Sequence, residues 1–176
     1  MYSQLTLRPP TAVDGASIHE LVSKCPPLDC NSRYCNLLQA SHFSSTSIVA
    51  DVDGALHGCI TGYRIPDRED SLFVWQVAVS PEARGQGLAL SMLEALLSRL
   101  PDVQYLETTV TPDNEPSMKL FSRLGELKKA AVGKTVLFEK NAHFDGEHED
   151  EILLRVGPLN SLTNATTDAE PSNEEG

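Results

Sequence analysis

Apolar residues recur along the chain at two spacings, which predict a mixture of strands and helices. Alternating or continuous apolar runs bounded by Gly, Pro, Asn or Asp are typical of strands. Apolar residues three to four positions apart are typical of helices with one buried face. The strands predicted in this way are residues 5–8, 46–51, 56–63, 72–79, 105–110, 135–138 and 152–156.

Four helices are expected, each with a start or stop signal. The first follows a cap at Thr11 or Asp14 and is broken by Pro26. The third ends at Pro101, and Gly125 closes the fourth. The second to fourth helices are expected at residues 33–40, 88–100 and 116–124, and the expected apolar faces are Ile18, Leu21 and Val22 in the first, Tyr34, Leu37 and Leu38 in the second, and Leu88, Met92, Leu93, Leu96, Leu97 and Leu100 in the third.

The run at residues 72–79 is almost continuously apolar, which predicts a central strand covered on both faces. Asp53-Gly54 separates two other strands and favours a two-residue hairpin turn. Residues 66–70 form a charged turn. The order of strand, two helices, a run of strands, helix, strand, helix and strands predicts a mixed α/β fold with one core.

Composition indicates one domain followed by a tail. The chain has 176 residues, of which 40% are hydrophobic, enough for a single sizeable core. After Pro158 the sequence consists mainly of Asn, Thr, Ser, Asp and Glu, which cannot bury a core. We therefore predict a domain over residues 1–159 and a disordered acidic tail over residues 160–176.

The net charge of −11 argues against nucleic acid as a partner, because phosphate binding needs a basic face. An acidic protein suits a cationic substrate, although a solvated acidic surface is the simpler explanation. No window has the roughly 18 apolar residues of a membrane span, and residues 1–8 lack the apolar core of a signal peptide. The sequence therefore predicts a cytoplasmic protein without membrane contact.

The cysteines and histidines do not predict a metal site. Cys25, Cys30 and Cys35 follow a C-x4-C-x4-C pattern, which matches neither zinc nor redox spacings, so free thiols are expected. His148-Glu-Asp-Glu151 also departs from the H-E-x-x-H spacing of zinc proteases. No metal is therefore expected.

The segment Arg84-Gly85-Gln86-Gly87-Leu88-Ala89 predicts an anion site. It follows a buried strand and opens an amphipathic helix, so several backbone N–H groups point at one spot. Glycine lets the backbone approach a diphosphate closely. The alternative is an ordinary turn between a strand and a helix. With the strand and helix around it, the segment favours an enzyme that holds a nucleotide-bearing cofactor.

Two segments together resemble the GNAT superfamily of N-acetyltransferases. Residues 84–89 fit its (Gln/Arg)-x-x-Gly-x-(Gly/Ala) pattern, and residues 114–125 resemble its Asn-x-x-(Ser/Ala)-x-x-(Leu/Phe)-Tyr-x-x-x-Gly segment. The resemblance implies acetyl-CoA as cosubstrate and a mostly antiparallel twisted sheet flanked by helices, with a V-shaped splay between two central parallel strands. The cofactor-binding residues it implies are Val77 and Val79 through their backbone, Arg84, Gly85, Gln86, Gly87, Leu88, Ala89, Asn114, Ser117 and Phe121.

Further segments resemble one branch of that superfamily, the L-2,4-diaminobutyrate N-acetyltransferases of ectoine biosynthesis. The resemblance covers about residues 5–157 and implies acetyl transfer to the 4-amino group of diaminobutyrate. It also implies a homodimer and a product later cyclised to a compatible solute, which protects against osmotic stress. The matching segments are residues 28–34, 42–46, 72–79, 107–112 and 148–151.

Five residues are candidates for contact with the substrate amine. Asp29 and Glu151 can hold an ammonium group, and Asp29, Tyr34 and Glu151 are the candidates for a general base, which the sequence leaves unknown. Trp75 and His148 are expected to contact the substrate. The alternatives are a helix cap at Asp29, core packing for Trp75 and Tyr34, and a solvated acidic run around Glu151.

One position departs from the superfamily pattern. Phe121 stands where many of these enzymes have a tyrosine that protonates the leaving thiolate, so another group such as Tyr34 must serve, or backbone dipoles stabilise the charge. The departure keeps a non-catalytic acyl-CoA sensor open as an alternative. Another alternative is an acetyltransferase for a different small amine or a protein N-terminus.

Overall fold

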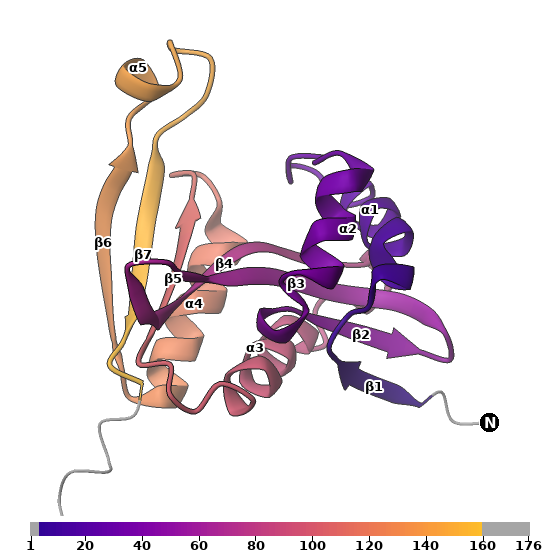
Figure 1. The fold of residues 1–176 in the computed structure, drawn as a ribbon. Coiled ribbons are helices and arrows are strands. Elements are labelled where there is room, and N and C mark those ends of the chain that lie inside the picture. Colours follow the sequence, from indigo (N-terminus) through magenta and orange to yellow (C-terminus); the bar gives the residue numbers. More distant parts are fainter. Residues whose placement is uncertain (1–3, 160–176) are drawn as a thin grey trace, which may run out of the picture.

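The structure, a computed structural model, describes residues 4–159 and consists of one seven-stranded sheet with helices on both faces (Figure 1). The tail predicted for residues 160–176 lies outside the described residues. The strands follow the order β1-β2-β3-β4-β5-β7-β6 across the sheet. Their bounds are Leu5–Arg8 (β1), Ile48–Val52 (β2), Ala55–Ile65 (β3), Arg68–Val79 (β4), Tyr105–Val110 (β5), Ala131–Phe138 (β6) and Glu151–Gly157 (β7).

The two central strands, β4 and β5, form the parallel pair of the sheet, and the other described neighbours are antiparallel. Only Ser71, Leu72 and Phe73 of β4 pair with β5. Both strands continue beyond these pairs without pairing each other, so they diverge towards their carboxyl ends. The fold class and the splay predicted from the sequence are therefore confirmed.

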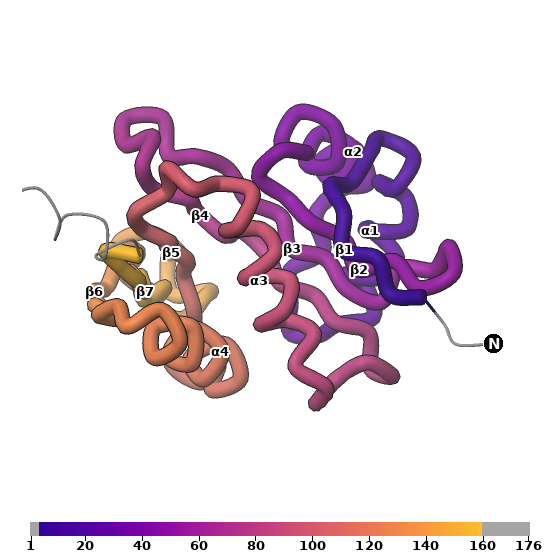
Figure 2. Tube along the Cα trace, turned by 90° about the horizontal axis from the view of Figure 1, so that it is seen from below, coloured from indigo at the N-terminus to yellow at the C-terminus, as the bar shows by residue number. Residues whose placement is uncertain are grey.

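The helices form two layers. The first layer packs over β2–β4, and the second covers the opposite face, as Figures 1 and 2 show. A small cluster around Ile18 and Cys59 lies under the first layer, and the main core around Leu72 and Phe121 lies under the second. The first layer contains α1 (Gly15–Ser23) and α2 (Arg33–Ser41), the second contains α3 (Leu88–Ser98) and α4 (Glu115–Lys128), and a short α5 (Lys140–His143) lies between β6 and β7.

A β-bulge in β4 changes which side chains share a face. Thr61 pairs with Gln76 and Gly62 with Val74, so Trp75 is an extra residue on β4. Val74 and Val77 consequently both pack towards the main core, although they are an odd number of residues apart. The prediction that residues 72–79 are covered on both faces was wrong at Trp75, which is 42% exposed.

The face of α2 that is buried was also predicted wrongly. Tyr34 is 69% exposed, whereas Asn36 and Gln39 are fully buried. Asn36 Nδ2 donates to Gln39 Oε1 at 2.9 Å, and His19 Nδ1 lies 3.0 Å from Asn36 Oδ1. These hydrogen bonds satisfy both polar ends of the Asn36 amide and Oε1 of Gln39, whereas the buried Nε2 of Gln39 has no hydrogen-bond partner among the described residues. A polar face of α2 therefore turns inward, while Leu37 and Leu38 are half-buried and Tyr34 is exposed.

Several predicted boundaries shift, three of them at α4, β4 and β6. Gly125 does not close the fourth helix, because α4 continues to Lys128. A Cβ at Gly125 would lie 2.6 Å from Val132 Cγ2, so the glycine serves close packing of α4 on β6. The charged turn is shorter than predicted, because β4 already begins at Arg68, and β6 begins at Ala131 rather than at residue 135. The Asp53-Gly54 hairpin is confirmed, with both residues at positive φ.

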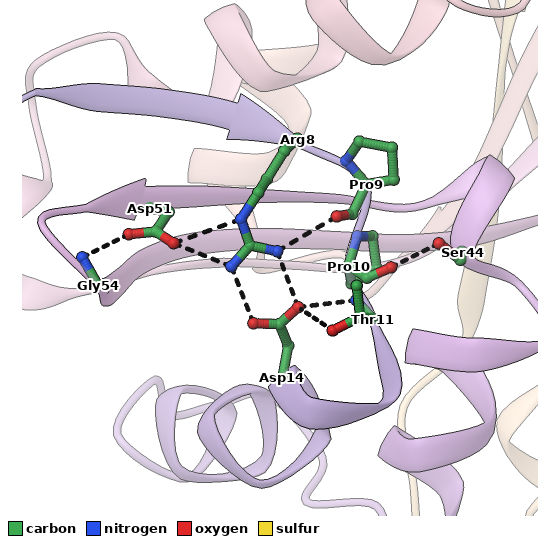
Figure 3. A network of polar contacts seen from close by, with 8 residues as sticks. All are labelled: Arg8, Pro9, Pro10, Thr11, Asp14, Ser44, Asp51 and Gly54. Atoms are coloured by element: carbon green, nitrogen blue, oxygen red, sulfur yellow. Dashed lines mark hydrogen bonds and ion pairs between the residues drawn. The ribbon is translucent and has the colours of Figure 1, made fainter.

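Arg8 joins β1 to β2 and to the first helical turn (Figure 3). Its guanidinium donates to both carboxylate oxygens of Asp14, at 2.8 and 2.9 Å, and to Asp51 Oδ2 at 2.9 Å. Asp14 also accepts from the backbone N–H of Thr11. The hydrogen bonds from Arg8 lower the pKa of Asp14 and of Asp51 below their ordinary value. The network fixes the N-terminal strand beside the α1–α2 layer.

Candidate active site

The glycine turn between β4 and α3 has the geometry of an anion site. Gly85 and Gly87 have φ values of 74° and 76°, and a Cβ at either would have no atom within 4 Å. Gly87 is the N-cap of α3, and no side chain caps the helix there. The first N–H groups of α3 therefore remain available to a ligand, and the helix dipole adds positive potential. These features fit the diphosphate of a coenzyme A cosubstrate.

A cavity of about 610 Å³ lies along this turn and the splay. Val77 and Val79 are on its wall, on the part of β4 that has no partner in β5. Two of the predicted cofactor-binding residues are not on the wall: Gln86, whose Nε2 donates to Glu82 O, and Phe121, which is 1% exposed in the main core. The other predicted residues on the wall are Arg84, Gly85, Gly87, Leu88, Ala89, Asn114 and Ser117.

A second cavity, of about 630 Å³, is acidic. Asp29, Trp75, His148 and Glu151 lie on its wall, so the structure brings together four of the five predicted substrate residues from distant parts of the chain. None of the described residues on this wall is a lysine or an arginine. The fifth predicted substrate residue, Tyr34, is not on the wall of this cavity, because its side chain is directed from α2 to solvent. Three further carboxylates on the wall were not predicted: Asp113, Glu147 and Glu149.

The two cavities adjoin at the splay. Pro27, Leu28, Asn114 and Pro116 line both of them. Asn114 Oδ1 accepts from the backbone N–H of Ser117 and so caps α4, which fixes the side chain at the boundary. A ligand that extends from the glycine turn along the splay would therefore end beside the acidic cavity.

His148 and Glu151 form a pair on the acidic wall. His148 Nε2 lies 3.7 Å from Glu151 Oε1, and His148 Nδ1 lies 2.7 Å from the carbonyl oxygen of Glu149. Because that carbonyl only accepts, Nδ1 carries hydrogen and donates. In the neutral ring, Nε2 then keeps its lone pair and lies beside the Glu151 carboxylate.

The carboxylates of the acidic wall differ in their partners. Glu149 forms an ion pair with Lys140 at 2.7 Å, and the side chain of Asp113 accepts from Thr111. Asp29 is held through its backbone, with its carbonyl accepting from Gln76 Nε2 at 2.7 Å. Sequence spacing had no signal for Gln76 as part of the site, because only the bulge at Trp75 directs it to this cavity.

Two cysteines, Cys25 and Cys59, lie in the small core cluster under the first helix layer, and the first of them borders the 610 Å³ cavity along the glycine turn, called the cofactor cavity from here on. Cys25 is on its wall and donates from Sγ to the carbonyl of Val79 at 3.3 Å. Burial raises the pKa of Cys59 to about 12, so this thiol stays protonated.

Among residues 4–159 there is no group of three or more His, Cys, Asp or Glu that could hold a metal ion. No helix in the same range is long and apolar enough to cross a membrane.

Comparison with known proteins gives the family. The family model of the acetyltransferase (GNAT) family matches residues 16–125, which include the glycine turn and most of the splay. The chain belongs to this acetyltransferase family. The L-2,4-diaminobutyric acid acetyltransferase of Methylotuvimicrobium alcaliphilum is 52% identical over 160 residues, which cover 90% of this chain and 93% of that protein. The L-2,4-diaminobutyric acid acetyltransferase of Vibrio cholerae is 47% identical over 156 residues, which cover 88% of this chain and 90% of that protein.

A solved structure of a related enzyme has the same fold. The diaminobutyrate acetyltransferase of Paenibacillus lautus, in complex with L-2,4-diaminobutyric acid and coenzyme A, superposes with a TM-score of 0.85. The two sequences are 37% identical, and the superposition covers 90% of this chain and 97% of the other chain. That structure holds both coenzyme A and a diamino acid.

Proposed function

We propose that this protein transfers the acetyl group of acetyl-CoA to the 4-amino group of L-2,4-diaminobutyrate, giving N4-acetyl-L-2,4-diaminobutyrate and CoA. The observation that carries the proposal is the pair of adjoining cavities, one along the glycine turn and the splay and the other acidic. The names of the relatives and of the solved neighbour support the choice of substrate.

The acidic wall solves the first problem of the reaction, which is to bind a cation and then remove its proton. An amine that behaves like lysine has a pKa near 10.4, so its neutral form costs roughly 4–5 kcal/mol near pH 7, at about 1.36 kcal/mol per pKa unit. Asp29 and Glu151 bind the ammonium group, and the His148–Glu151 pair offers a route for the proton. The neutral amine then attacks the thioester carbon, and the C–N bond forms as the C–S bond breaks. CoA leaves as the thiolate and takes up the proton that the nitrogen loses when the amide forms.

No tyrosine stands at the position from which many acetyltransferases of this superfamily protonate the leaving thiolate. Phe121 is packed in the core and has no proton to give. Tyr34, the alternative acid suggested by the sequence, lies outside both cavity walls. We infer that the open N–H groups of β4 and α3 stabilise the developing charge, since fixed backbone dipoles act strongly where water is excluded.

The choice between the two amines of the substrate must come from positioning. The α-amine is the less basic of the two, so intrinsic reactivity does not favour the 4-position. Carboxylates from distant parts of the chain lie on the wall of the acidic cavity, and together they can hold both ammonium groups of diaminobutyrate in one orientation. The 4-amino group would then point at the boundary formed by Leu28 and Asn114.

The direct test is thiol release from acetyl-CoA with diaminobutyrate, compared with lysine, ornithine and spermidine. Mass spectrometry of the product identifies the acetylated nitrogen. Preferred turnover of diaminobutyrate at its 4-amino group supports the proposal. Preferred turnover of another amine would indicate a different substrate, and binding of CoA without thiol release on any amine would indicate a non-catalytic sensor.

We further propose that the enzyme is a cytoplasmic homodimer that serves ectoine biosynthesis under osmotic stress. The relatives support the metabolic role through the substrate in their names. Sedimentation velocity would reveal the oligomeric state, with a mass of about twice the 19.2 kDa chain expected. A monomer at the concentrations used for activity assays would refute the dimer without affecting the proposed reaction.

A further inference from the structure

The segment between α1 and α2, residues 24–32, forms part of the wall of both cavities. Cys25 and Pro26 line the cofactor cavity, Asp29 and Asn31 line the acidic one, and Pro27 and Leu28 line both. The segment contains turns but no helix or strand. Its position therefore depends on what attaches it to the sheet.

Side-chain hydrogen bonds attach this segment to β4 at both ends. Cys25 Sγ donates to Val79 O at 3.3 Å on the cofactor side. On the acidic side, Gln76 Nε2 donates to the carbonyl of Asp29 at 2.7 Å, and Gln76 Oε1 accepts from Asn31 Nδ2 at 3.3 Å. Gln76 is 6% exposed, so water competes little for its amide.

We propose that Gln76 is a positioning residue, whose amide fixes the stretch from Asp29 to Asn31 over the acidic cavity and so sets the affinity for the amine. The role rests on the proposed acetyl transfer. It requires an amide, because one end must donate to a carbonyl and the other must accept from an N–H. Glutamate can accept but cannot donate when ionised, and methionine of similar size replaces neither bond.

Steady-state kinetics separate this role from a purely structural one. In Gln76→Met, the KM for diaminobutyrate should rise about tenfold, the loss expected when a buried amide loses its hydrogen bonds. The KM for acetyl-CoA should change less than about twofold, because the cofactor end stays attached through Cys25. Gln76→Glu should raise the amine KM at least as much, since its carboxylate would face the carbonyl of Asp29.

Cys25→Ala is the matched control, because it removes the attachment at the other end of the same segment. It should leave the amine KM within about twofold of the wild-type value, since Cys25 lies on the wall of the cofactor cavity and not on that of the acidic one, and any effect should appear in the KM for acetyl-CoA. Equal rises in both KM values for Gln76→Met, or an unchanged amine KM, would overturn the proposal. If Gln76→Met does not fold, Asn31→Ala removes one of the two bonds and should raise the amine KM about threefold.

Hydrogen–deuterium exchange gives a test that does not depend on the substrate. Amides of residues 28–32 should exchange faster in Gln76→Met than in the wild-type protein when neither substrate is present. Unchanged exchange would overturn the positioning role. Faster exchange in a protein that does not acetylate diaminobutyrate would instead refute the proposed substrate and leave the attachment of the segment standing.

Discussion

His148 Nε2 and Glu151 Oε1 lie 3.7 Å apart on the wall of the acidic cavity. The ring is oriented by its other nitrogen, which donates to the carbonyl of Glu149 at 2.7 Å. Glu151 begins β7, whose backbone pairs with both β5 and β6, so its position is set by the sheet. The two side chains are therefore held in one place on the wall of the acidic cavity.

Glu151→Gln should lower kcat for diaminobutyrate acetylation by about tenfold or more, because the amide keeps the size but removes the charge that stabilises a cation. Glu149→Gln is the matched control on the same wall, and it should cost less because Lys140 already neutralises that carboxylate. Thiol release at saturating acetyl-CoA measures both. Wild-type turnover in Glu151→Gln would remove this residue from the mechanism.

The glycine turn leads to a second prediction. Gly87 has a φ of 76°, and alanine there costs roughly 1–2 kcal/mol of backbone strain. Its Cβ would also project into open space next to the cofactor cavity. Gly87→Ala should therefore raise the KM for acetyl-CoA about tenfold and reduce the rise in melting temperature that CoA produces.

Gly54→Ala provides the control for strain alone. Gly54 has a φ of 87° in the β2–β3 hairpin, and a Cβ there also meets no atom within 4 Å. The substitution should lower stability by a similar amount while leaving the KM for acetyl-CoA unchanged. A similar KM change in both variants would mean that general destabilisation, rather than cofactor binding, explains the effect at Gly87.

Close packing between α4 and β6 leads to a third prediction. A Cβ at Gly125 would lie 2.6 Å from Val132 Cγ2 and 3.1 Å from the carbonyl oxygen of Ala130. Valine has little rotamer freedom with which to give way. Gly125→Ala should reduce the free energy of unfolding by about 1–2 kcal/mol, measured by urea denaturation. Gly133→Ala, whose Cβ would meet its nearest atom at 3.9 Å, should change it by less than about 0.5 kcal/mol.

The parts of the fold that could be predicted are those that depend on local patterns. The strand 105–110 agrees with β5, and the apolar face predicted for the helix after the glycine turn agrees with the buried residues of α3. The Asp53-Gly54 turn also followed from its residues alone. The buried face of α2 did not, because Asn36 is buried with a hydrogen bond to His19 of α1, and Gln39 is buried beside it with a hydrogen bond from Asn36, contacts that no hydrophobic pattern records.

The candidate site also has one part that a local sequence pattern predicts and another that depends on tertiary structure. The glycine turn is one continuous segment, so its backbone geometry could be predicted from the sequence. The acidic cavity collects residues 27–31, 75–76, 109–116 and 147–151, and spacing along the chain does not bring these together. The resemblance to a known branch supplied Asp29 and Glu151. Glu147 and Glu149 lie on the wall because they flank His148 in the chain, although the sequence did not single them out, and Asp113 lies there through tertiary structure alone.

The last prediction concerns pH and the network around Arg8. The pKa of Asp14 and of Asp51 is lowered in the folded protein, relative to an ordinary value of 3.8, chiefly by hydrogen bonds from Arg8. A carboxyl group with a lowered folded-state pKa stabilises the fold above its unfolded pKa and loses this effect as the pH falls through the folded pKa. Arg8→Met, which keeps the aliphatic stem, should cost about 2 kcal/mol at pH 7.

The cost of Arg8→Met should stay constant from pH 7 down to about pH 5 and shrink as the pH falls below about 4, because protonated carboxyls no longer favour the guanidinium. Melting temperatures of both proteins across this range measure the difference. Lys24→Ala, which removes a pair with Glu20 between side chains 61% and 68% exposed, should shift the melting temperature far less than Arg8→Met does near pH 7. A difference between wild type and Arg8→Met that persists unchanged below pH 3 would show that lost packing, rather than the carboxylate hydrogen bonds, accounts for it.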